Sequence, residues 1–143
     1  MPCINFPIDS IGPILEVGIS SPNSLRSHGA PSPAISWFKA LVDTGCSGTS
    51  IHASAARQCG IRVIGKSAIV TATGVVPVNV FYGDLHIRSL LSWQTPFHSR
   101  FDDQSFAELP HKHPSFDVLL GMDVLNLGSF SMNGGSRQAT FCW

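Results

Sequence analysis

The sequence predicts a mostly β protein with one or two short helices, in which the strands form a closed or sandwiched sheet. Three observations support this fold class. Short β-rich segments recur along the 143 residues, separated by turns rich in glycine and proline, of which the chain has 13 and 10. Helical patterns are confined to two short segments. Hydrophobic residues make up 43% of the chain, enough for one packed core, so we assign residues 1–143 to a single domain.

The first part of the chain predicts two strands that flank an irregular segment. After an irregular start, residues 14–19 have strand composition. Residues 20–33 collect Ser, Pro, Gly and Asn, which predicts a loop inserted between paired strands. Residues 35–42 are typical of a strand that ends at Asp43, and the two glycines within 44–48 predict a tight turn immediately after it.

The middle of the chain predicts a short helix and then a hairpin. Residues 50–59 are rich in alanine and are followed by a glycine, which predicts a helix with Ser50 as its N-cap. Residues 69–73 and 75–81 are β-rich arms on either side of Gly74. Pro77 lacks an N–H, so it restricts its arm to an edge position.

The last part of the chain returns to strands. We expect strands at 85–87 and 90–93, a loop over the polar residues 98–114, a buried strand at 116–121 and a short helix at 122–127. Two alternating segments around the turn Asn133-Gly134-Gly135 complete the chain, at residues 130–132 and 138–143.

Charge and composition disfavour some classes of partner. Nine Lys and Arg residues balance nine Asp and Glu residues, so no basic field would attract nucleic acid. No segment is long and apolar enough to span a bilayer, and the start of the chain lacks the features of a secretory signal. We therefore expect a cytoplasmic protein without membrane or nucleic-acid partners. Its four cysteines form no C-x-x-C pair and are expected to be mostly reduced thiols.

The strongest chemical signal is the Asp43-Thr44-Gly45 tripeptide, which follows the apolar pair Leu41-Val42. This pattern is the active-site signature of aspartic proteases, and Val-Leu-Leu-Gly at 118–121 resembles their later hydrophobic-hydrophobic-Gly motif. With the Gly74 hairpin between these motifs, residues 14–143 resemble the retropepsins, the single-domain aspartic proteases of retroviral type. The form Asp-Thr-Gly-x-Ser-Gly-Thr resembles their bacterial branch. The resemblance implies a closed, barrel-like acid protease fold and an endopeptidase acting on extended peptides.

The resemblance also implies roles for individual residues. Asp43 would act as general base in one subunit and general acid in the other, Thr44 would interlock across the two-fold axis, and Gly45 would admit the substrate backbone. Substrate contacts are implied for the loop, for the tip of a mobile flap and for the later glycine, at Ser47, Thr73, Gly74 and Gly121. The strand at 138–143 resembles the family's interface strand, and we expect it to be an exposed β edge that pairs with a partner chain.

The chemistry sets a requirement for a second carboxyl group. Peptide hydrolysis without a metal or a covalent intermediate needs one carboxylate to activate water and one carboxylic acid to polarise the carbonyl. Two such groups about 3 Å apart share a single proton. The chain has one Asp-Thr-Gly, so we expect a homodimer in which two copies of Asp43 meet, with no metal or other cofactor.

Two positions depart from the retroviral pattern. Retroviral members commonly have Asp two residues after the motif's glycine and Arg after the later glycine, whereas this chain has Ser47 and Met122. Both partners of that ion pair are absent together, so no charge is left unpaired, but a contact near the dimer interface is missing. Cys46, next to the catalytic loop, is expected to be a small filler of the packing.

Other interpretations remain open at this stage. The chain can be a catalytically silent retropepsin-like module for dimerisation or peptide binding, because a fold does not determine a function. Cys46 with His52 or His86 would make a cysteine hydrolase, and the pair His111-x-His113 would suggest a metal. We expect Asp123 to bind free amides at a helix start rather than to assist Asp43.

Overall fold

The computed structural model of the chain describes residues 1–89 and 97–143, so the strand expected at 90–93 lies outside the described residues. Neither of its two α-helices is long and apolar enough to cross a membrane. In chain order the elements are β1 (Cys3–Pro7), β2 (Ile14–Ser20), the 3-10 turn η1 (Asn23–Leu25), β3 (Ser36–Val42), β4 (Ser50–His52), α1 (Ala53–Gln58), β5 (Arg62–Thr71), β6 (Gly74–Ser89), β7 (Phe97–Leu109), β8 (Val118–Leu120), α2 (Met122–Leu125), β9 (Ser129–Asn133) and β10 (Gln138–Cys142).

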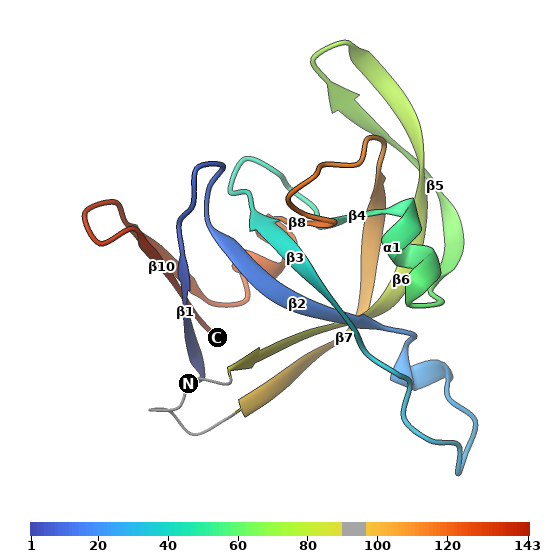
Figure 1. The fold of residues 1–143 in the computed structure, drawn as a ribbon. Coiled ribbons are helices and arrows are strands. Elements are labelled where there is room, and N and C mark those ends of the chain that lie inside the picture. Colours follow the sequence, from blue (N-terminus) through green and yellow to red (C-terminus); the bar gives the residue numbers. More distant parts are fainter. Residues whose placement is uncertain (90–96) are drawn as a thin grey trace.

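Six strands close into a barrel, which confirms the expected fold class (Figure 1). Seven strands pair in the order β2-β3-β8-β4-β7-β6-β5, and β2 also pairs with β6, so the barrel closes and β5 remains outside it. Inward-facing side chains such as Val17, Leu120 and Phe106 are fully buried. Their burial supplies the main driving force for closure, because apolar area removed from water stabilises by about 25 cal/mol per Å².

The two arms around Gly74 form the expected hairpin. Thr71 of β5 pairs with Gly74 of β6, and Gly74 has φ +129°, a conformation that favours glycine. The hairpin is longer than the sequence suggested, since β6 runs without interruption through the segment expected as a separate strand at 85–87. Its tip extends beyond the barrel at the same end as the loop that follows β3 (Figure 1).

The chain ends form a second sheet, which corrects two expectations. Residues 3–7 were expected to be irregular, but they form β1, which pairs with β10. β10 also pairs with β9, so the sheet has the order β1-β10-β9 and its last strand is central. The expectation that residues 138–143 form an exposed edge is therefore wrong, because both sides of β10 are already paired within the chain.

A disulfide bond joins the two ends of the chain, which corrects the expectation of mostly reduced thiols for this pair. Cys3 and Cys142 lie directly opposite each other in β1 and β10, with their Cα atoms 4.1 Å apart. Their separation of 139 residues hides this contact from any local sequence pattern. Cys46 and Cys59 are free thiols. Burial raises the pKa of Cys59 to about 11, so this thiol stays protonated and unreactive at neutral pH.

Two local expectations differ from the structure. The polar segment at 98–114 was expected to be a loop, but most of it belongs to β7. This strand alternates partly buried residues, such as Phe97 and Phe101, with exposed polar ones, as an antiparallel strand does when one face meets solvent. The helix N-cap is His52 rather than Ser50, because the Ser54 N–H donates to His52 Nδ1 at 3.2 Å.

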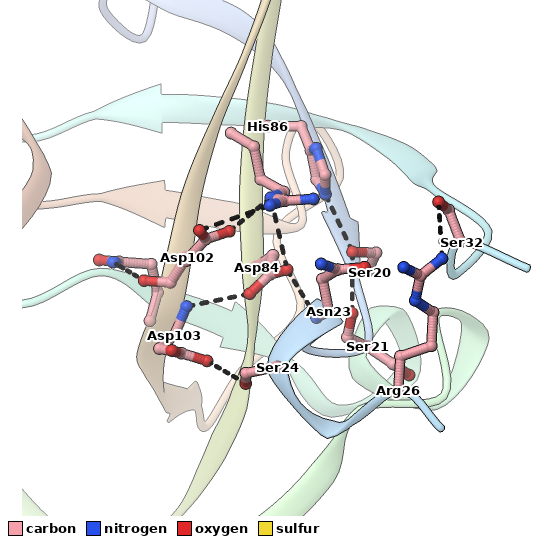
Figure 2. A network of polar contacts seen from close by, with 12 residues as sticks. Ser20, Ser21, Asn23, Ser24, Arg26, Ser32, Asp84, His86, Asp102 and Asp103 are labelled. Atoms are coloured by element: carbon pink, nitrogen blue, oxygen red, sulfur yellow. Dashed lines mark hydrogen bonds and ion pairs between the residues drawn. The ribbon is translucent and has the colours of Figure 1, made fainter. Parts of the chain in front are cut away.

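A buried carboxylate attaches the segment 20–33 to the barrel (Figure 2). Asp84 is fully buried, and its two oxygens accept from the backbone N–H of Asn23 at 2.8 Å and of Asp103 at 2.9 Å. Arg100 Nε lies 3.9 Å from the same carboxylate. Hydrogen bonds to a charged group each contribute about 1.5–3 kcal/mol, so Asp84 fixes the start of the segment firmly.

Next to this carboxylate, His86 links β2 to β7. Its Nε2 lies 2.9 Å from Ser20 Oγ and its Nδ1 lies 2.9 Å from His98 Nε2. Burial, and to a lesser extent His98, lower the pKa of His86 from 6.5 to about 4. The ring is therefore neutral at neutral pH, because burial disfavours its charged form.

We predict that His86 makes the protein less stable in mild acid. The unfolded chain binds a proton at His86 below about pH 6.5 while the folded chain does not until about pH 4, so the free energy of unfolding falls as the pH drops through this window. The loss between about pH 7 and about pH 5 should be roughly 1–2 kcal/mol. Urea unfolding of the wild type and of His86→Gln at both pH values measures it. An equal loss in both proteins would contradict the assignment to His86.

We also predict that the terminal disulfide is a major source of stability. Replacing Cys3 and Cys142 together by alanine should lower the free energy of unfolding by about 2–5 kcal/mol, because the bond restricts the unfolded chain. Urea unfolding with and without a thiol reductant measures the effect. The reductant should destabilise the wild type and leave the double variant unchanged. A reduced wild type as stable as the oxidised one would show that the bond contributes nothing.

Candidate active site

The candidate active site is built on the loop that follows β3. β3 and β8 run parallel, and Val42 pairs with Leu120 at their ends. Immediately after this pair, the Asp43 N–H donates to Leu120 O at 3.0 Å. The Gly45 N–H donates to Asp43 Oδ1 at 2.8 Å, so the turn holds the carboxylate in one orientation. A partly exposed carboxylate is thereby presented at the end of a rigid strand.

The first turn of α2 closes over this loop. The backbone N–H groups of Met122 and Asp123 donate to Cys46 O at 2.8 Å and to Ser47 O at 3.0 Å. The first N–H groups of a helix have no partner within it, so here the loop carbonyls satisfy them. Gly121 makes this approach possible, because a Cβ on it would lie 2.5 Å from the backbone C and O of Gly48.

Thr49 and Asp123 form a contact that the sequence reasoning missed. Thr49 is buried and donates to both oxygens of Asp123, from its backbone N–H at 2.9 Å and from Oγ1 at 2.7 Å. Thr49 Oγ1 also accepts from the Gly121 N–H at 3.1 Å. Asp123 receives the Val124 N–H as well, so its expected structural role is confirmed. The sequence feature that could have indicated this contact is Thr49, the last residue of the Asp-Thr-Gly-x-Ser-Gly-Thr form.

The predicted site residues lie in two groups. Asp43, Thr44, Gly45 and Ser47 share one loop, and Gly121 packs against it. Thr73 and Gly74 lie at the hairpin tip, where their hydrogen bonds run to Thr71 of the same hairpin. Within the described residues, no hydrogen bond joins the hairpin tip to the loop. The loop and its support form one unit, whereas the tip stands apart from them.

The other candidate side chains have different partners. Cys46 Sγ donates to Gly48 O at 3.2 Å, while His52 bonds Ser54 and His86 bonds Ser20, so neither histidine is paired with this thiol. In the part of the chain that the structure describes, no three His, Cys, Asp or Glu side chains converge as metal ligands would. Among these residues, Cys46 therefore forms no Cys–His pair of the kind that a cysteine hydrolase uses.

A closed β barrel whose Asp-Thr-Gly loop is backed by a hydrophobic-hydrophobic-Gly strand defines an aspartic protease fold. The chain belongs to the aspartyl protease family, whose family model matches residues 36–124, more than half of the chain. Among solved structures it is similar to a retropepsin-like aspartic protease from Rickettsia conorii, with 12% sequence identity and a TM-score of 0.62. The alignment covers 98% of this chain and 90% of that one, which confirms the retropepsin-like fold. No curated protein matches the sequence.

We predict that Gly121→Ala destabilises the protein. The added methyl group would meet the Gly48 backbone at 2.5 Å and Cys46 O at 3.0 Å, so the loop must move. The free energy of unfolding should fall by about 1–3 kcal/mol. Gly48→Ala is the matched control, because a Cβ there meets nothing within 4 Å, and it should change stability by less than about 0.5 kcal/mol. Thermal unfolding of both variants measures the difference, and equal effects would refute the close-packing argument.

Proposed function

We propose that the protein is an aspartic endopeptidase that hydrolyses extended peptides with two Asp43 carboxyl groups, one from each subunit of a homodimer. The observation that carries this proposal is the Asp43 carboxylate itself. It is oriented by the Gly45 N–H at the end of β3, on a loop that α2 holds from behind. Membership of the aspartyl protease family supports the same reaction class.

The second carboxyl group is proposed to come from a second copy of the chain. Asp123, which follows the later glycine motif, is an alternative within the chain, but both of its oxygens already accept hydrogen bonds from Thr49. Because β10 is central in the terminal sheet, the edges available to a partner are β1 and β9. Most side chains of β9 are exposed, among them Met132 at 56%. We propose that the terminal sheets of two copies meet along such an edge.

The proposed chemistry follows from two carboxyl groups at one site. Two like charges about 3 Å apart do not both ionise, so the pair keeps one proton. The ionised Asp43 accepts a proton from the attacking water, and the protonated Asp43 of the other subunit donates to the scissile carbonyl oxygen. When the C–N bond breaks, the first Asp43 gives its proton to the leaving amine and the second takes a proton from a hydroxyl of the tetrahedral intermediate, so the pair returns to its starting state. Loss of the shared proton at alkaline pH stops the reaction.

Substrate is proposed to bind between the loop and the β5–β6 hairpin. An extended peptide can pair with strand-like backbone through main-chain hydrogen bonds, so its sequence is read by side-chain contacts. Thr73 and Gly74 would cover the peptide from the hairpin tip, while Ser47 and Gly121 belong to the floor. The exposed tip, with few bonds to the rest of the chain, suits a flap that closes over bound substrate.

We predict that Asp43→Asn abolishes peptide cleavage without unfolding the protein. An amide cannot accept the proton of the attacking water, so kcat/KM should fall by at least about a thousandfold. Cleavage of an unbiased peptide library, followed by mass spectrometry from acid to neutral pH, measures activity. Thermal unfolding confirms that the variant is folded.

Asp123→Asn serves as the control for loss of a carboxylate beside the loop. It should lower the free energy of unfolding but lower kcat/KM far less than Asp43→Asn does. Cleavage by the wild type should persist with a metal chelator. Cleavage retained by Asp43→Asn would overturn the proposal. A wild type that forms dimers but cleaves nothing would instead support a silent binding or dimerisation module.

A further inference from the structure

β5 is an unusual strand because almost all of it is exposed. It forms the edge of the seven-stranded sheet, and among residues 1–89 and 97–143 it pairs with β6 alone. From Arg62 to Ala68 every residue is exposed, although Val63 and Ile64 are apolar. A long edge strand presents a row of backbone N–H and C=O groups that can pair with another strand.

A groove lies beside the start of this strand, between β5 and the segment 20–33. Its volume is about 680 Å³. Exposed apolar side chains form part of its wall, with Leu25 at 66%, Val63 at 51% and Ile64 at 58%. We call this feature the β5 groove and define it by Pro22, Leu25, Arg26, Arg62, Val63 and Ile64. An exposed apolar patch with a charged rim is typical of an interaction site.

The charged side chains that line the β5 groove are all cationic, and the Asp103 carboxylate beside it accepts a hydrogen bond from Ser24 Oγ at 2.6 Å. Arg26 and Arg62 line the groove and Lys66 follows on β5, and β5 contains no Asp or Glu. Within the described residues none of these three cations makes an ion pair: the Arg26 guanidinium donates instead to Ala30 O at 2.9 Å. Their charges are therefore available to a partner that carries carboxylates.

These cations also disfavour pairing between two copies of the chain. An antiparallel β5–β5 pair centred near Ile64 would place Arg62 of one copy opposite Lys66 of the other, and like charges across a strand pair are destabilising. Edge lysines protect natural sheets from such self-association. The surface is therefore suited to an acidic strand and not to its own copy.

A register shift in β5 determines how an acidic strand would be recognised. The pairing with β6 shifts between Val63 and Gly65, which leaves Ile64 as an extra residue. Because of this bulge, Arg62 and Lys66 lie on opposite faces of the hairpin although they are four residues apart. A peptide added along β5 would meet a cation on each face, so carboxylates spaced by an odd number of residues fit best.

We propose that β5 and the β5 groove bind an extended acidic segment of the protein substrate, outside the peptide that is cleaved. The role in substrate binding rests on the proposed peptidase function, whereas the binding itself does not. The segment adds as a strand to the open edge of β5, with apolar residues against Leu25 and Ile64 and carboxylates near Arg62 and Lys66. Thr71 is nine residues beyond Arg62, about 30 Å along the strand, so a segment bound near Arg62 lies well away from the hairpin tip.

Binding is tested first with the full-length Asp43→Asn protein, which removes cleavage from the measurement. The probe is a ten-residue fluorescent peptide with Glu at every third position and Val or Thr elsewhere. It should bind saturably, and replacing its Glu residues by Lys should weaken binding at least about tenfold. Arg62→Glu combined with Lys66→Glu in the protein should have the same effect. Lys112→Glu, an exposed charge reversal outside the groove, should change the Kd less than about twofold.

Three results would overturn the proposal: no saturable binding, equal binding of the Glu and Lys peptides, or no effect of the double charge reversal. Sedimentation at several protein concentrations identifies the competing occupant. If Arg62→Glu combined with Lys66→Glu changes self-association while peptide binding is absent, the surface is a contact between copies.

A cleavage experiment separates this proposal from the peptidase function. The wild type is given one cleavable peptide with and without the acidic segment attached by a flexible linker. We expect the segment to lower KM at least about fivefold with little change in kcat, and Arg62→Glu with Lys66→Glu to remove this difference alone. If neither peptide is cleaved, the peptidase function fails while the binding result stands. Equal KM values for both peptides would reject a role of this surface in substrate binding.

Discussion

The contact between the Asp43 loop and the first turn of α2 is the constraint on which the site depends. The N–H groups of Met122 and Asp123 bind carbonyls of this loop, and Gly121 admits the loop backbone at a distance that no side chain would tolerate. The parallel pair of β3 and β8 sets the register of both segments. Because the buried Thr49 donates a hydrogen bond to Asp123, the start of α2 is also attached to the core. These hydrogen bonds attach the Asp43 loop to the rigid barrel, so the Asp43 carboxylate keeps one position.

A second polar centre attaches the segment 20–33. Asp84 is fully buried and satisfied by two backbone donors, which attach the segment 20–33 to β6 and β7 (Figure 2). An unpaired carboxylate in such a place would cost several kcal/mol, so the segment and the carboxylate stabilise each other. The wall of the β5 groove that this segment provides therefore depends on a residue that does not touch the groove.

The sequence was informative where the determinants are local. The Asp-Thr-Gly turn, the strand before it and Gly121 could be predicted because glycine spacing and apolar runs mark such features directly. β7 was misread because its polar residues alternate with phenylalanines on a strand with one solvated face. The pairing of Cys3 with Cys142 and the central place of β10 depend on contacts between the two ends of the chain, and the bond between Thr49 and Asp123 spans 74 residues. No pattern within a short window carries that information.

The bond between Cys3 and Cys142 turns almost the whole polypeptide into a covalent ring. A single cut in an exposed segment, such as 20–33, would therefore not release a fragment. It would create new chain ends at the cut while the original ends stay joined, as in a circular permutant, and proteins tolerate such rearrangement at exposed loops. One cleavage by any protease in such a segment would therefore leave a single covalently joined molecule whose strands are still held together.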